Sequence, residues 1–329
     1  MENPLKTAIL AAAATSDEPD RKYRLRVDEH LPDGIRRIAR GQLHNAHEKL
    51  SGASQRRFGE AVHETRKRLK RLRACVRLAR DGIGEETYER ENAAFRMAGR
   101  RLSAGRDAQV LLETIDSLSE RFADELPARV TAVLRARLED ERKHAEAAAQ
   151  HDEAGTAAVV DELERGLTRT PAWTFDNDDF DALSPGLRRI YRRGRKRMRA
   201  ARKDPSAENL HEWRKRVKDL WHATQIVRAA QPKRLKRVSR RAHKLADLLG
   251  DGHDLSMLRD YVETHPQCFE NETSKQALIA VIDRRSNRLR DKALKRGRRL
   301  YKRPPKRFVR AIERGWAKRA PARPQPLAG

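Results

Sequence analysis

Apolar residues recur along most of the chain at the spacing of an amphipathic α-helix, most clearly in Ala61–Arg80 and Asn209–Arg228. Neither stretch contains Gly or Pro, and Leu, Arg, Lys and Ala, which favour helices, dominate both. The apolar positions that share one face are Val62, Leu69, Leu72 and Val76 in the first stretch and Leu210, Trp213, Val217 and Leu220 in the second. We therefore predict two helices, each with one apolar face for a core.

A separate face of each predicted helix carries a stripe of cations that begins with a histidine. The first stripe consists of His63, Arg66, Lys67, Lys70, Arg73 and Arg77, and the second of His211, Arg214, Lys215, Lys218 and His222. Like charges at this spacing repel by a few tenths of a kcal/mol per pair. A charge run is usually a solvated face, but two matched stripes favour a function, and an anion is the ligand they favour.

The two stripes belong to a larger internal repeat. Both stretches contain His-Glu-x-Arg-Lys-Arg-x-Lys-x-Leu, and two further blocks recur in the same order. LPDGIRRIAR at 31–40 matches LSPGLRRIYR at 183–192, and LSAGRD at 102–107 matches LGDGHD at 249–254. The further cationic candidates that these blocks supply are Arg36, Arg37, Arg40, Arg106, Arg188, Arg189, Arg192 and His253. The unit of roughly 150 residues is too long for a solenoid repeat.

This repeat predicts an all-α chain, internally duplicated, with two four-helix bundles related by pseudo-two-fold symmetry. We expect a mobile leader over 1–22, a first bundle over 23–150 and a second over 183–319. Gly, Pro and acidic residues over 151–182 predict a linker with one short helix, and 320–329 is expected to be a disordered tail. The recurring LxxGxD blocks are expected to be turns in which Asp107 and Asp254 cap helices.

Composition narrows the class of partner. The chain has 74 Lys and Arg against 48 Asp and Glu, a formal net charge of +26, which predicts a polyanionic partner. Aromatic residues make up only 5%, which favours phosphate over base recognition because bases are read by stacking. Trp221 borders the second stripe, and we assign it to the core. Cys75 and Cys268 lack partner spacing, which fits buried thiols in a reducing, cytoplasmic compartment.

Catalytic and metal motifs are missing from the sequence. His44 and His47 have a ligand spacing but no nearby third ligand, and neither repeated helix contains HExxH. We find no P-loop, nucleophile elbow or carboxylate cluster for Mg²⁺. The apolar run Ala8–Ala14 is too short to span a bilayer, so no membrane insertion is expected. We predict no cofactor, no metal and no enzymatic activity.

Over about residues 25–317, the two histidine-headed helices and the paired LxxGxD blocks resemble the CHAD family, named for its histidine-bearing α-helical domain. The resemblance implies two four-helix bundles around a basic pore that binds inorganic polyphosphate. The second repeat departs from the first, with Trp221, His222 and Gln225 where the first has Arg73, Ala74 and Arg77.

The functional hypothesis is a non-catalytic polyphosphate-binding protein, recruited to polyphosphate granules in the cytoplasm. Two alternatives stay open. The basic runs Arg188–Lys203 and Arg284–Arg307 suit a nucleic-acid-associated protein, since non-specific binding uses phosphates almost alone. A polyphosphate-modifying enzyme would have to act through His63 or His211 without a metal.

Overall fold

The computed structural model describes residues 22–103 and 106–319. All regular structure in these residues is helical, which confirms the predicted all-α class. The predicted leader, apart from Lys22, and the predicted tail lie outside the described residues. The α-helices are α2 (Leu31–Ser51), α3 (Phe58–Ile83), α4 (Glu85–Arg101), α5 (Arg106–Arg121), α6 (Ala128–His151), α7 (Glu153–Arg169), α8 (Ser184–Lys203), α9 (Ala207–Ile226), α10 (Pro232–Thr264), α11 (Glu272–Leu300) and α12 (Pro305–Ala317). Single 3₁₀ turns are η1 (Gln55–Arg57), η2 (Thr170–Ala172), η3 (Phe180–Ala182), η4 (Val227–Ala230) and η5 (Pro266–Cys268).

The two cationic stretches are α3 and α9, and local signals set where these helices begin and end. α3 ends at Ile83 because Gly84 has a φ of 78°, in the left-handed region that favours Gly. α9 begins after Ser206, whose side chain accepts a hydrogen bond from the Asn209 N–H. The apolar faces of both helices are buried as the periodicity predicts, with Leu72 and Trp213 fully excluded from solvent.

Four helices of the first half, α2, α3, α4 and α7, pack around one core. Val159 and Leu163 of α7 are buried in it. Gly166 allows the close approach, because a Cβ there would lie 2.9 Å from Leu43 of α2 and 3.2 Å from Phe95 of α4. Residues 151–182, predicted as a linker with one short helix, therefore contribute the fourth helix of this bundle. Gly166 reflects tight packing here, where the sequence suggested a breaker.

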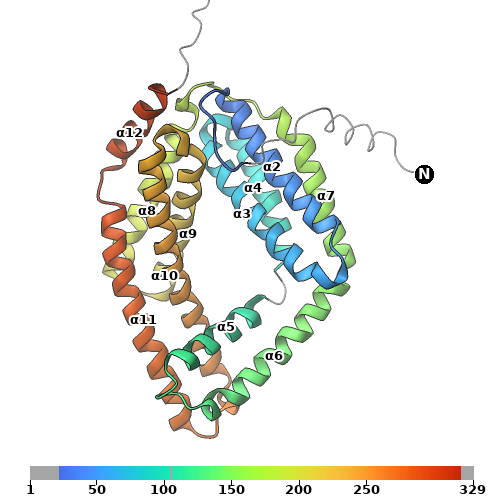
Figure 1. Ribbon diagram of the computed structural model, residues 1–329, viewed down its shortest axis with the longest axis vertical. Helices are drawn as coiled ribbons and strands as arrows, with labels where there is room; N and C mark the ends of the chain where they lie inside the picture. The colour runs from blue at the N-terminus through green and yellow to red at the C-terminus, as the bar shows by residue number, and fades with distance from the viewer. Residues whose placement is uncertain (1–21, 104–105, 320–329) are drawn as a thin grey trace, which may run out of the picture.

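α5 and α6 extend away from this bundle and pack against the second half of the chain. In Figure 1 they cross the lower part of the molecule toward α10 and α11. Their shared core, the second apolar cluster, includes Leu112, Ile115, Leu134, Leu138, Leu258 and Ile282. The predicted first bundle over 23–150 is thus corrected, because α5 and α6 bury their apolar faces on α10 and α11. The two halves are interlocked through this second core.

α10 is one continuous helix of 33 residues that passes through the LGDGHD block. The predicted turn is wrong at this block, since Leu249, Gly250 and Leu255 are buried residues within an uninterrupted helix. Asp254 consequently lies inside α10 and does not cap a helix. Asp107 lies in the first turn of α5, where a carboxylate is favoured by the helix dipole.

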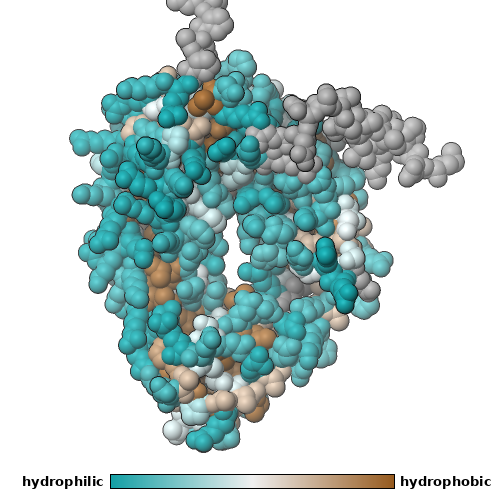
Figure 2. Space-filling model, viewed as in Figure 1, coloured by the Kyte–Doolittle hydropathy of each residue, from teal (hydrophilic) through white to brown (hydrophobic). Residues whose placement is uncertain are grey.

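The second bundle is built from α8, α9, the first part of α10, and α12. α3 contacts both α8 and α9, so the main core continues from one bundle into the other without interruption. Below this junction the molecule is open: Figure 2 shows a gap in the middle of the face, surrounded by side chains in that view. The junction therefore places α3 and α9 beside the opening.

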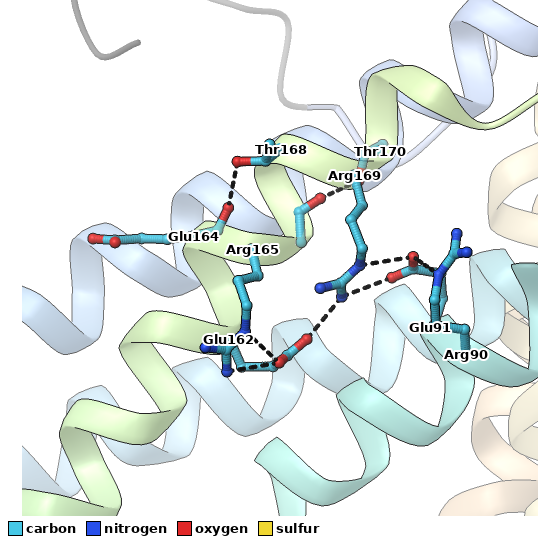
Figure 3. A network of polar contacts seen from close by, with 9 residues as sticks. Arg90, Glu91, Glu162, Glu164, Arg165, Thr168, Arg169 and Thr170 are labelled. Atoms are coloured by element: carbon cyan, nitrogen blue, oxygen red, sulfur yellow. Dashed lines mark hydrogen bonds and ion pairs between the residues drawn. The ribbon is translucent and has the colours of Figure 1, made fainter. Parts of the chain in front are cut away.

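A buried ion pair ties α7 to α4 (Figure 3). The side chain of Glu91 is 0% exposed, and it accepts hydrogen bonds from Arg169 Nε at 2.9 Å and Nη2 at 3.0 Å. Arg169 also reaches Glu162 at 2.7 Å, and Arg90 contacts Glu91 at 3.2 Å. A buried carboxylate is tolerated only when it is paired, so α7 is held to α4 by charge as well as by apolar contact.

We expect the Arg169→Met variant to lose about 3 kcal/mol of unfolding free energy, because it leaves Glu91 buried with one remaining partner. Arg165→Met is the matched control on the same helix. Its ion pair with Glu162 is more exposed, with Arg165 at 58%, and its loss should change stability by less than about 1 kcal/mol. Urea unfolding of both variants measures the difference. Equal losses would show that the buried pair does not anchor α7.

Candidate functional site

The cationic stripes of α3 and α9 meet at the junction of the two bundles. Arg77 of α3 donates a 2.6 Å hydrogen bond to Asp219 of α9, and Arg216 also pairs with Asp219, at 2.9 Å. Further along the same helices, Lys70 and Lys218 face one another closely enough that the charge of Lys218 helps to lower the pKa of Lys70. The structure therefore brings the two stripes together.

Arg106 at the start of α5 extends the site from the first half. Its Nη1 lies 3.5 Å from Nδ1 of His63, and its charge also acts on Arg66 and Lys70. Arg66 Nη1 donates to the carbonyl oxygen of Leu102, the residue directly after α4, at 2.9 Å. The end of α4 thus holds Arg66, and the start of α5 brings Arg106 beside the stripe of α3.

The second half builds the corresponding part from α9 and α10. The guanidinium of Arg214 lies against Gly250, where an added Cβ would come within 3.2 Å of Nη2. His211 and His253 face each other with ring centroids 4.1 Å apart. Arg214 Nε and His211 Nδ1 are buried and have no hydrogen-bond partner among the described residues. Arg214 Nε is a donor, and an oxygen acceptor such as a phosphate oxygen is the kind of group that would satisfy it.

Electrostatics give the site its character. Burial, then the neighbouring cations, lowers the pKa of Lys70 and of Lys218 to about 8 in each case. Burial, then His253, lowers the pKa of His211 to about 4, and burial and Arg106 lower that of His63. All four pKa values are lowered, which means that the site disfavours positive charge on these side chains. A bound anion would reverse each of these effects.

Five cations at this junction form no ion pair with any described carboxylate: Arg66, Lys70, Arg106, Arg214 and Lys218. Lys67 and Lys215 differ, because each pairs with the glutamate three residues before it, Glu64 at 2.9 Å and Glu212 at 2.6 Å. The unpaired five come from α3, α5 and α9, elements distant in sequence. We call them the central cation cluster.

Several predicted site residues serve other contacts. Arg36 donates to the Trp173 carbonyl and to Asp33, and Arg37 is bound to Glu29. Arg189 pairs with Asp81 at the end of α3. Their partners account for these three arginines without a ligand. Three further predicted site residues are exposed on the surface and are not part of the central cation cluster: Arg40, Arg188 and Arg192.

The remaining candidates lie at the edge of the cluster. Arg73 donates to Asn92 at 3.2 Å, and burial and Arg77 lower its pKa to about 10. His222 is turned into the protein beside Tyr23, and burial lowers its pKa to about 3, so it is neutral at physiological pH. Arg77 is neutralised by Asp219. The structure thus narrows the predicted stripes to their first two turns.

Sequence reasoning missed the acidic side of the site. Burial raises the pKa of Asp254, although Arg214, Lys218 and Arg106 act in the opposite direction. Burial likewise raises the pKa of Asp251, one turn earlier on α10. Placing both in a turn concealed them, whereas continuing the helical periodicity of α10 through Gly250 would have put Asp254 on the same face as Gly250, against which the guanidinium of Arg214 lies. No group of carboxylate, His and Cys side chains in the described part of the chain could hold a metal ion.

Comparisons with known proteins agree with this geometry. The CHAD domain family model matches residues 37–263, well over half of the chain. The chain belongs to the CHAD family. Its structure is similar to the crystal structure of the CHAD domain from the plant Ricinus communis, with a TM-score of 0.62 and 19% sequence identity. That match covers 88% of this CHAD chain and 98% of the other and shows the same fold. A comparison with curated protein sequences gives no match.

The described helices of this CHAD protein include none that is both long and apolar enough to cross a bilayer.

The lowered pKa values of Lys70 and Lys218 predict an unusual response to pH. Both lysines release protons near pH 8, while an unfolded lysine does so near about 10.4. The unfolded chain binds more protons between these values, so their contribution makes stability rise with pH across that window. Affinity for any anion at the cluster should fall across the same window, because the charges that bind it are lost.

Anion affinity and urea stability measured from pH 7 to pH 10 test both directions. Lys70→Met/Lys218→Met should flatten both profiles. The matched control, Lys67→Met/Lys215→Met, removes two lysines that are paired with glutamates and should keep the slopes of the parent. Parallel slopes in the parent and the first variant would contradict the assignment.

Proposed function

We propose that this CHAD protein binds inorganic polyphosphate at the central cation cluster, beside the opening in Figure 2. The observation that carries the proposal is that Arg66, Lys70, Arg106, Arg214 and Lys218 converge without a described carboxylate partner. Elsewhere in the described chain arginines pair readily, as Arg169 does with Glu91. Cations that converge and stay unpaired are a binding site for repeated negative charge.

The ligand is a flexible phosphate chain. Charge reaches the cluster from both halves, so a thin polymer that lies along the seam contacts α3 and α9 together. Arg66, Arg106 and Arg214 supply forked donors for phosphate oxygens, and Lys70 and Lys218 supply point charges. Stacking surfaces for bases are missing from the cluster itself. Inorganic polyphosphate has this chemistry: many charges, no bases and little width.

The internal duplication fits this binding mode. The blocks that recur in the sequence place His63 with Arg106 in one half and His211 with His253 in the other, at the same site. We infer two related halves that each supply part of one polyphosphate site. A basic pore follows if the polymer passes through the opening, and recruitment to cytoplasmic polyphosphate granules would follow from binding.

We infer that the protein does not turn its ligand over. Hydrolysis or transfer of phosphate needs an activated nucleophile and, in most enzymes, a metal that stabilises developing charge. The histidines at the cluster have lowered pKa values, and the carboxylates nearest to it, Asp251 and Asp254, are spread along one helix face. This arrangement supports binding without catalysis.

Competition separates polyphosphate from nucleic acid. We expect long-chain polyphosphate to displace duplex DNA at physiological salt, because a thin, flexible chain can contact the cations of α3, α5 and α9 in succession while a wide, stiff duplex cannot. Fluorescence anisotropy with a labelled duplex measures the displacement, and both affinities should weaken as salt rises. Tighter binding of DNA would favour the nucleic-acid alternative.

Polyphosphate recovered after incubation with Mg²⁺ should keep its initial chain length, and shortening would contradict the non-catalytic assignment.

Charge reversal tests the shared site. Arg66→Glu/Lys70→Glu and Arg214→Glu/Lys218→Glu should each weaken polyphosphate binding by at least about 100-fold, since each charge-assisted contact contributes about 1.5–3 kcal/mol. The fourfold variant should lose less than the sum of the two pairs, because all four residues share one ligand.

Arg199→Glu/Arg202→Glu on exposed α8 is the matched control, with the same change in net charge and a much smaller expected effect. Thermal unfolding should show no loss of stability in either site pair, because reversal relieves repulsion in the free protein. Wild-type affinity in either folded pair variant would exclude a site shared by both halves.

A further inference from the structure

A second cavity lies apart from the central cation cluster. Its volume is 570 Å³, within the range of small-molecule sites, and it lies open to solvent between the segment before α2, the end of α9 and the start of α10. The residues that line it are Lys22, Tyr23, Arg24, Trp221, Gln225, Arg228, Lys236, Ser239, Arg240 and His243. None of the five residues of the central cation cluster is among them.

The wall of this cavity is fixed by contacts between the two halves. The Leu25 N–H donates to the Ile226 carbonyl at 2.9 Å, and Leu25 is 1% exposed. The Tyr23 hydroxyl donates to the Arg71 carbonyl at 2.9 Å. The segment before α2, drawn in dark blue in Figure 1, is thereby attached to both α3 and α9. These hydrogen bonds hold the wall of the cavity in place.

Charge on the cavity lining has a single sign. No carboxylate lines the cavity, and within the described part of the chain Arg24, Arg228, Lys236 and Arg240 form no ion pair. His243 is the exception, at 3.0 Å from Asp247. Ser239 adds a hydroxyl donor. Four cations without an ion-pair partner line the same cavity, which suits a ligand with several negative charges close together.

Aromatic rings form one side of the cavity. Trp221, which we assigned to the core from its sequence, is only half-buried, and the ring of His243 stacks on it at 4.2 Å with an interplanar angle of 13°. The equivalent positions in the first repeat are Arg73 and Arg77, where the second repeat has Trp221 and Gln225. Those arginines are used by Asn92 and Asp219. The second repeat therefore has two cavity-lining residues at positions where the first repeat has arginines with polar partners.

We propose that this cavity, which we call the Trp221 pocket, binds a compact, multiply phosphorylated small molecule. Its cations, Arg24, Arg228, Lys236 and Arg240, hold the phosphates, and Trp221 with His243 forms an aromatic wall. Both an inorganic oligophosphate and a nucleoside triphosphate carry the required cluster of charge. The site is independent of the central cation cluster in residues and in position, so it goes beyond the binding of long polyphosphate.

Trp221 also provides the measurement. The other three tryptophans, Trp173, Trp213 and Trp316, are buried, at 1%, 0% and 7% exposure, so Trp221 is the one positioned to report a ligand. The experiment uses the full chain carrying Lys70→Glu/Lys218→Glu, which disables the central cluster. Sodium tripolyphosphate and adenosine triphosphate are the two probes, each titrated with fluorescence detection and confirmed by calorimetry.

We expect saturable binding of both probes, and at least a tenfold loss in affinity when Lys236→Ala/Arg240→Ala is added. Arg199→Ala/Arg202→Ala, added to the same background, is the matched control and should leave affinity unchanged. Tighter binding of adenosine triphosphate that Trp221→Leu reduces to the tripolyphosphate level would identify a nucleotide as the source. Equal affinities in the presence of Trp221 would identify an inorganic oligophosphate.

Absence of saturable binding overturns the proposal, as does an affinity that Lys236→Ala/Arg240→Ala leaves unchanged. These results are separable from failure of the polyphosphate proposal, because that failure appears as wild-type polyphosphate affinity in the Lys70→Glu/Lys218→Glu chain itself.

Discussion

Repulsion between cations that face one another across the α3–α9 junction is the constraint on which the structure depends. Burial first, and then neighbouring cations, lower the pKa of Lys70 and of Lys218, with Lys218 acting on Lys70 and Arg214 acting on Lys218. Such an arrangement opposes folding unless other contacts hold the helices together. The apolar faces of α3 and α9 provide these contacts, because Leu72, Trp213 and their neighbours belong to one core that continues through both bundles.

Two further features keep the junction closed under this repulsion. Asp219 pairs with both Arg77 and Arg216, so its carboxylate offsets part of the positive charge at the junction. The second core, formed by α5, α6, α10 and α11, joins the halves again on the far side of the opening. Arg106 begins α5, so the connection that interlocks the halves also places a cation at the site. Stability and binding therefore use the same elements of the fold.

The arrangement of charge distinguishes the two proposed anion sites. At the central cation cluster, charge is concentrated by elements that converge from both halves, which suits a polymer that can contact them in succession. In the Trp221 pocket, charge lines a single cavity, which suits a ligand of limited size. The difference arises in the second repeat, where Trp221 and Gln225 replace arginines. Divergence after a duplication would in this way give one chain two kinds of phosphate recognition.

The helices and the cationic stripes could be predicted from the sequence, because helical periodicity is a local pattern that is visible in residues three and four apart. His63, Arg66, Lys70, His211, Arg214 and Lys218 were found in this way. Local pattern failed where packing between distant segments decides. The glycines of α7 and α10 read as breaks, yet Gly166 and Gly250 are sites of close contact inside helices.

Which cations are paired with a carboxylate depends on contacts that exist only in the folded chain. Arg77 and Lys70 look alike in the sequence, but Asp219, which pairs with Arg77, lies 142 residues away along the chain. Arg37 and Arg189 are likewise matched to Glu29 and Asp81 by the fold. The partners of α5 and α6 were also undetermined, because an amphipathic pattern specifies that a face is buried without specifying what covers it. Charge compensation and helix pairing are non-local, and for that physical reason they appear only in the folded molecule.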